Sequence, residues 1–397
     1  MTARFSVLSL DAAQPECLAK ALAQLPATTS LAIACGNNRE IRLLAGINHT
    51  QLPLVAFSSC LTSTSNTDVG RADQQHLQVL LVDDPTGAYG IASAKLDAAN
   101  LSAQVAELLQ TATVQANRQG HQPALIWCLQ PPGYEEQLLT ALSTNTGPHV
   151  PVIGGSSADD DINGQWCQFD GVQLDRDLLV LIVLYPSCPI SWFFSSGYHQ
   201  LNLQATVTKA AARRIYQLDH KPALHVYNNW LDKLGLPALS GDKILAQSAL
   251  VPLGRVISSQ PVPLYLLSHP AETYADGSIA LMSEVTEGEQ LYLMMGSEDA
   301  LVRRAGHVVR VAADTLKLRY QAVPAAAVVF YCAGCMLQVR NRYHEIHQYV
   351  RDQLGDLPFL IAYTFGEQGC FADGSNRHGN LMISALLFGT EPHVSAI

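Results

Sequence analysis

Charged residues are scarce in this sequence, and their scarcity limits the kinds of protein it can be. Only 15% of the 397 residues are charged, against 48% that are hydrophobic, and the formal net charge is −10. No run of Arg or Lys is longer than two residues. Nucleic-acid sites need a basic surface that displaces counterions, so we expect no nucleic-acid partner.

Long apolar runs and a leader pattern are also missing. The longest strictly apolar runs, such as residues 178–185, are far shorter than the roughly 20 residues that cross a bilayer. The first residues lack the apolar segment of a secretory signal. We therefore expect no membrane insertion and a cytoplasmic location, where the nine cysteines stay reduced unless they bind metal or do redox work.

Strand and helix patterns alternate along the chain, which predicts an α/β (mixed α+β) fold with large mixed sheets flanked by helices. A chain of this length exceeds one ordinary core, so we expect two domains, residues 1–215 and 216–397. The boundary follows a change of pattern near residue 215, where residues 207–218 and 225–234 favour helices.

A strand–helix–strand–strand unit recurs three times. Its first strand carries a cysteine at the same place in each copy: Cys35, Cys128 and Cys332. Its second strand is entered through a proline and ends in small or polar residues, and a further apolar strand closes the unit. Recurrence at this scale indicates duplicated architecture.

The C-terminal unit carries the candidate metal or redox ligands. Its first strand delivers Cys332 and Cys335 to a strand end, and its second strand ends near Glu367 and Cys370. If the two strands are neighbours, these groups share one cleft. A thiol at a strand end that opens a helix is expected to have a lowered pKa, which suits an iron–sulfur cluster, zinc or a reversible disulfide.

Packing as small apolar side chains is the competing interpretation of these cysteines. Cys35 and Cys128 at equivalent positions support it for Cys332, but not for Cys335 or Cys370. The second Cys-x-x-Cys pair that would indicate a zinc site strongly is missing.

Histidine is the other residue type that metal or heme requires. His344 and His347 are three residues apart on a predicted helix, so they share a face of it. His344 is the candidate metal or heme ligand. The simpler interpretation is that it is an exposed helix residue. The sequence does not rank the alternatives, which are His378, His199, His225, His269 and His307.

Two strand exits supply candidate ligand-binding groups. At one exit lie Tyr363, Gly366 and Glu367, and the acid could hold a ligand amine or only cap backbone N–H groups. At the other exit, Gly154 and Ser156 lie in a Gly-Gly-Ser-Ser stretch whose backbone N–H groups suit an anion. No lysine follows as in a phosphate-binding P-loop, so nucleotide chemistry is not expected.

These stretches resemble the markers of the FIST family (F-box and intracellular signal transduction proteins). The similar segments are residues 151–159, 331–334 and 363–367, and the likeness extends over roughly residues 28–390. The family pattern usually has Cys-Ala-Gly-Arg, whereas this chain has Cys335 in the fourth position. The resemblance implies an N-terminal and a C-terminal FIST domain and a small-ligand sensor, so we predict no enzymatic activity.

The chain is also similar to the nitric-oxide-sensing heme proteins of this family. That resemblance implies heme b as the cofactor and a sensor histidine kinase as the regulated partner, without assigning the iron ligand to a histidine. The leading hypothesis is thus a cytoplasmic signal-transduction sensor. A cysteine-based redox or metal switch is the alternative, and an enzyme with Cys332 or Cys370 as nucleophile ranks last because no base-and-partner constellation is visible.

Overall fold

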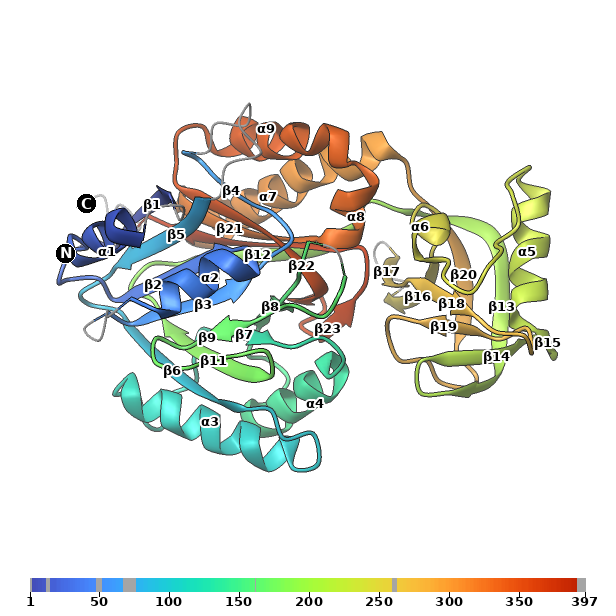
Figure 1. Ribbon diagram of the computed structural model, residues 1–397, viewed down its shortest axis with the longest axis horizontal. Coiled ribbons are helices and arrows are strands. Elements are labelled where there is room, and N and C mark those ends of the chain that lie inside the picture. The colour runs from blue at the N-terminus through green and yellow to red at the C-terminus, as the bar shows by residue number, and fades with distance from the viewer. Residues whose placement is uncertain are drawn as a thin grey trace.

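The molecule consists of a large body and a smaller lobe at one side of it (Figure 1). The computed structural model describes residues 2–11, 15–47, 52–66, 76–160, 162–258 and 263–390. Residues 199–295 form the lobe, and the remaining described residues form the body. The predicted fold class is confirmed, since mixed parallel and antiparallel sheets are flanked by helices.

The first unit of the body lies at the start of the chain. Its elements are β1 (Arg4–Asp11), α1 (Pro15–Ala23), β2 (Leu31–Gly36), α2 (Asn38–Ala45), β3 (Leu54–Ser58) and β5 (His76–Asp83). β2 and β3 are parallel, β5 is antiparallel to β2, and β1 pairs with β5. Two short strands extend the sheet beyond β3: β9 (Gln168–Phe169) and β10 (Leu174–Asp175).

The second and third units repeat this arrangement. The second comprises β6 (Ala88–Lys95), α3 (Leu101–Gln115), β7 (Leu125–Gln130), α4 (Glu135–Thr146), β8 (Val152–Ser156) and β11 (Leu178–Tyr185). The third comprises β12 (Ile190–Ser196), α7 (Glu298–Tyr320), β21 (Pro324–Cys332), α8 (Ala333–Gln338), a 3-10 turn (Arg340–Arg342), α9 (Tyr343–Leu354), β22 (Phe359–Cys370), β23 (Asn376–Gly379) and β24 (Met382–Gly389). The orders β1-β5-β2-β3, β6-β11-β7-β8 and β12-β24-β21-β22 are equivalent, so the recurring unit is confirmed.

Backbone pairing joins the units. β8 of the second unit pairs antiparallel with β22 of the third, which merges their strands into one sheet. β4 (Thr62–Thr64), which follows β3, also pairs with β22, as does β23.

One core is shared by the inner faces of all three units. The Phe330 ring lies edge-on to Trp127, with centroids 5.3 Å apart, and 6.4 Å from the Phe57 ring, so each unit contributes an aromatic side chain. β2, β7 and β24 are buried along their whole length. Strands covered on both faces read as continuous apolar runs, which is why the sequence shows them clearly.

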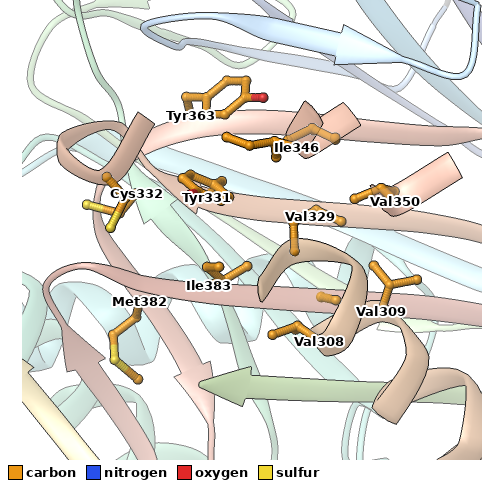
Figure 2. Packing of buried hydrophobic residues seen from close by; sticks show 14 of the residues in the cluster. Val308, Val309, Val329, Tyr331, Cys332, Ile346, Val350, Tyr363, Met382 and Ile383 are labelled. Carbon is orange, nitrogen blue, oxygen red and sulfur yellow. The ribbon is translucent and has the colours of Figure 1, made fainter. Parts of the chain in front are cut away.

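The helices cover the outer faces of the sheets (Figure 1). On the third unit, Val308 of α7 and Ile346 of α9 pack against a row of side chains on β21, Val329 and Tyr331, which ends at Cys332 (Figure 2). In the described part of the chain, no helix combines the length and hydropathy needed to cross a membrane.

The lobe is inserted between β12 and α7. Its elements are β13 (His199–Ala211), β14 (Arg214–Leu218), β15 (Lys221–Pro222), α5 (Ala223–Lys233), α6 (Leu245–Ser248), β16 (Leu253–Ser258), β17 (Leu264–Ser268), β18 (Pro270–Thr273), β19 (Ile279–Leu281) and β20 (Gln290–Met295). The strand order is β17-β16-β20-β13-β14-β19-β18.

The helix predicted over residues 207–218 is wrong, because this segment is the end of β13, a turn and β14. Helix-forming residues surround the turn, but Ala212 has a φ of 49° and reverses the chain. Along β13 the side chains alternate in burial, as in a strand with one covered face. The proposed domain boundary at 215/216 lies within β14 and stays a prediction.

Candidate functional site

Cys332 and Cys335 lie together where β21 ends and α8 begins. Cys332 is 7% exposed and Cys335 is 1% exposed. A hydrogen bond with Cys335, followed by burial, raises the pKa of the Cys332 thiol well above its ordinary value. The lowered pKa expected at this strand end is therefore wrong, because the junction is packed and excludes water.

Glu367 belongs to the same buried centre. Its carboxyl group is fully buried, and it accepts hydrogen bonds from the Met382 backbone N–H at 3.3 Å and from the Thr364 hydroxyl at 3.4 Å. Burial, followed by the proximity of Cys332, raises the pKa of this carboxyl well above its ordinary range. Burial at this position thus disfavours the charged form of the carboxyl group.

A third thiol, Cys60, reaches this centre from the first unit. It follows β3, is 4% exposed, and its backbone N–H donates to the Tyr363 carbonyl at 3.0 Å. Burial raises the pKa of Cys60 to about 12, with further contributions from Asp160 and Cys332. Tyr363 is itself buried, with its ring edge-on to Tyr331 at 5.5 Å. The sequence shows the strand that ends at Cys60, but not that it meets the third unit.

Backbone from all three units fills the place where a shared cleft was expected. The Ala158 N–H donates to the Ser58 carbonyl at 2.9 Å, and Phe365 of β22 pairs with Ser156 of β8. Together with the Cys60 contact, these bonds tie the ends of β3, β8 and β22 into one packed junction.

Cys370 lies elsewhere. It ends β22 six residues beyond Thr364, the parallel partner of Cys332. Between these two residues β22 carries a register shift next to Gly366, whose φ is 58°. The Cys370 thiol lies against Trp192 and 3.6 Å from the Phe371 carbonyl, and burial raises its pKa to about 11. The structure therefore does not bring the three predicted thiols together.

His344 is exposed on α9, with its ring edge-on to Tyr343 at 6.2 Å. His347 is buried instead, with Nε2 at 2.9 Å from the Thr64 carbonyl oxygen, and burial lowers its pKa. The predicted helix is interrupted by the 3-10 turn, and His344 faces solvent while the thiol centre is buried.

Ser156 and Gly366 lie close to the first turn of α4, whereas Gly154 does not. Ser156 Oγ donates to Glu135 Oε1 at 2.6 Å. A Cβ added to Gly366, whose φ is 58°, would lie 2.8 Å from the same oxygen. Gly154 packs against β7, since its Cβ would lie 2.1 Å from the Cys128 carbonyl oxygen. Two of these predicted ligand-binding residues thus surround a buried carboxylate.

Glu135, Glu136 and His378 form a group close enough to hold a metal ion. Arg213 of the lobe lies 2.9 Å from Glu135 and 2.6 Å from Glu136, and His378 Nδ1 lies 3.0 Å from Glu136. Burial opposes ionisation, but His378, Arg213 and hydrogen bonds outweigh it and hold the pKa of Glu135 below its ordinary range. Because Arg213 supplies the compensating charge, we interpret this group as an ion-pair network.

A pocket of about 600 Å³ lies where the body meets the lobe. The β12–β13 junction, the start of β17 and the first turns of α7 form its walls. Its polar and aromatic lining includes Tyr198, His199, Tyr265, Arg303, Arg304 and His307. Sequence reasoning missed this site because its residues come from four separate segments between positions 195 and 371, and no local motif unites them.

Tyr198 connects the pocket to the thiol centre. It lines the pocket, and its hydroxyl donates to the Ala249 carbonyl at 2.7 Å and lies 3.7 Å from Cys335 Sγ. Burial, followed by Cys335, raises the pKa of this phenol well above its ordinary value. The Tyr198 side chain therefore lies between the pocket and the buried Cys335 thiol.

Two of the histidines that the sequence left unranked, His199 and His307, line the pocket. Burial, Arg304 and Arg310 lower the pKa of His307, so its ring is neutral at pH 7. His269 is placed differently: it is buried with Nε2 at 2.8 Å from the Leu245 carbonyl oxygen.

A curated protein and several solved structures are similar to this chain. The uncharacterized protein MJ1623 of Methanocaldococcus jannaschii is 30% identical over 100 residues, which are 25% of this chain and 19% of that protein. The chain thus spans about a fifth of the length of this relative.

Among solved structures, a cyanuric acid hydrolase described as arising by structural concatenation is 9% identical to this chain, with a TM-score of 0.33. The match covers 98% of this chain and 100% of the hydrolase chain. The cyanuric acid hydrolase of A. caulinodans is 10% identical, with a TM-score of 0.33, and the match covers 97% of this chain and 98% of the hydrolase chain. This likeness to hydrolases contradicts the prediction that the chain is not an enzyme, and that prediction is withdrawn. TM-scores this low carry no activity over to this chain.

Family models account for most of the sequence. The FIST N domain matches residues 7–221, and the FIST C domain matches residues 223–370. The first match alone covers more than half of the chain, so this protein belongs to the FIST family.

Proposed function

We propose that this protein is a cytoplasmic signal-transduction sensor that binds a small ligand in the pocket between α7, β17 and the β12–β13 junction. The observation that carries the proposal is the pocket itself, which combines imidazole and guanidinium groups with aromatic walls beside a buried thiol centre. Apolar walls with a few convergent polar groups are typical of ligand sites. Membership of the FIST family supports a sensory role.

The position of the pocket suggests how binding is read out. Ser195 and Arg304 belong to the body, whereas Gln200 and Tyr265 belong to the lobe, and all four line the pocket. A ligand that contacts both parts favours the arrangement in which both contacts are made. We propose that a sensor histidine kinase is the partner that responds, as the family resemblance implies.

Heme b is the first ligand to test. The pocket offers His199 and His307 as candidate iron ligands, Arg303 and Arg304 as partners for carboxylates, and Leu264 with other apolar groups for a ring. The pocket therefore contains the types of side chain that bind heme. Bound heme would supply an iron that takes nitric oxide. Arg310 donates to His307 Nδ1 at 3.0 Å, which leaves the proton of the neutral ring on Nε2, so iron binding through Nε2 requires Arg310 to release the ring.

A heme titration of the purified protein tests this proposal. We expect a saturable Soret band that shifts when nitric oxide is added. A protein that shows no Soret band after titration with excess heme would rule out heme as the ligand.

A cysteine-based redox switch is the second candidate, favoured by the contact between Cys332 and Cys335. Exchange with a small disulfide such as oxidised glutathione would join the two sulfurs and break the S–S bond of the oxidant, and the two cysteine protons would pass to the two glutathione thiols that form. The raised pKa of Cys332 predicts slow reaction.

Thiol counting tests this candidate. The wild type should lose two thiols to oxidised glutathione, and Cys332→Ser and Cys335→Ser should abolish that loss. Cys370→Ser is the control, since Cys370 lies away from the pair, and it should behave like the wild type. An unchanged thiol count in the oxidised wild type would sink the redox switch.

A further inference from the structure

Positive charge is concentrated on one wall of the pocket, although the formal charge of the whole chain is −10. Arg303, Arg304 and His307 come from adjacent turns of α7 and line it together. The acidic groups in the first turn of this helix do not neutralise them, because Asp299 and Glu298 lie 2.8 Å and 3.8 Å from Arg342.

Arg304 is the cation whose charge is least compensated. One of its terminal nitrogens donates to Ser195 Oγ, but its Nε atom is buried without a hydrogen-bond partner among the described residues. Burial lowers the pKa of Arg304 to about 10. A partly buried cation without a counter-charge is unfavourable, and an anion brought by a ligand removes that penalty.

The neighbouring arginine differs. Arg303 is exposed, and after the dominant hydrogen bond from Arg342 its charge makes a small contribution to lowering the pKa of Glu345 on α9. Of the two arginines, Arg304 is therefore the more buried and the less compensated.

The remaining walls indicate what the anion is attached to. Leu264 and Phe371 are apolar, and the Tyr265 hydroxyl is already bonded to Gln200. A pocket of about 600 Å³ is much larger than a single oxyanion. We propose that the ligand is a small organic anion whose carboxylate or phosphate group binds Arg304 and Ser195, while its apolar part packs against Leu264 and Phe371.

This inference names the ligand class of the pocket described above and rests on that pocket being the ligand site. It is tested by titrating the full-length protein with sodium succinate and with inorganic phosphate, with sodium chloride at matched ionic strength as the blank. We expect saturable binding of at least one anion by calorimetry. Binding of succinate alone identifies a carboxylate ligand, and binding of phosphate alone identifies a phosphate ligand.

Variants locate the binding. Arg304→Gln should weaken binding at least tenfold, and Ser195→Ala should weaken it about threefold. Arg319→Gln removes the same charge from the exposed end of α7 and should bind like the wild type. Without ligand, Arg304→Gln should be at least as stable as the wild type, because an uncompensated cation has been removed.

The inference is overturned if neither anion binds saturably, or if Arg304→Gln and Ser195→Ala both bind like the wild type. Failure of the heme proposal can be distinguished from failure of the anion site. A protein that takes no heme but binds succinate or phosphate through Arg304 overturns heme and supports the anion site. A protein that takes heme with unchanged affinity after Arg304→Gln and binds neither anion overturns the anion site alone.

Discussion

At position 366, glycine meets two separate requirements. Its φ of 58° lies in the left-handed region, and a Cβ there would lie 2.8 Å from Glu135 Oε1 and 2.9 Å from His378 Nε2. The second requirement is the absence of a side chain, because Glu135 leaves no room for one. The Glu135 carboxylate cannot move far, since Ser156 and Arg213 both bind it.

Gly366→Ala should therefore destabilise the protein by about 2–4 kcal/mol, since backbone strain and a clash add together. Gly374→Ala is the matched control: its φ is 84°, but nothing lies within 4 Å of the added Cβ, so strain alone costs about 1–2 kcal/mol. Urea unfolding of both variants measures the difference. Equal losses would show that the contact with Glu135 is unimportant.

Residue patterns predicted part of the candidate site. The structure brings Cys332, Cys335 and Glu367 close together, because they belong to adjacent strands of one repeated unit and to the helix that follows. Cys370 is not among them, because it lies further along the same strand. Cys60 comes from another unit, and no local signal links it to Cys332.

At the scale of elements, burial decides what the sequence reveals. The three parallel pairs were recognisable because helices cover one face of each sheet and the common core covers the other, which requires apolar runs. The β13–β14 hairpin is covered on one face only, and its alternation was hidden by helix-forming residues around Ala212. The pocket is built from the ends of such elements, so no single periodicity marks it.

At the scale of the whole molecule, Arg213 ties the lobe to the body. It comes from the turn between β13 and β14 and binds Glu135 and Glu136 at the start of α4. The Glu284 backbone N–H, also in the lobe, donates to Glu136 at 2.8 Å. This network holds the lobe against the body. We propose that ligand binding influences the relative position of these two parts.

Arg213→Gln should destabilise the protein by about 2–4 kcal/mol at pH 7, because it leaves the buried Glu135 carboxylate without its arginine partner. The folded-state pKa values of Glu135 and Glu136 lie below the ordinary 4.5, so their stabilisation is present above about pH 4.5 and is lost as pH falls through the lowered values. The difference between variant and wild type should therefore shrink in acid.

Denaturant unfolding at pH 7 and at about pH 3, which lies below the ordinary carboxyl pKa of 4.5, measures this effect. Lys95→Gln is the matched control, because Lys95 pairs with Asp175 at the surface at 68% and 33% side-chain exposure. Such a surface pair contributes less than about 1 kcal/mol. A loss in Arg213→Gln that equals the control, or that does not change with pH, would count against the network as a link between lobe and body.

Heme affinity in histidine variants tests the central claim, that the pocket beside α7 holds the ligand, most directly. Soret titration should show that His199→Ala combined with His307→Ala lowers heme affinity at least tenfold, because both pocket imidazoles are gone. His344→Ala, on the exposed face of α9, should bind heme like the wild type. Wild-type affinity in the double variant, or loss of the Soret band in His344→Ala, would contradict the claim.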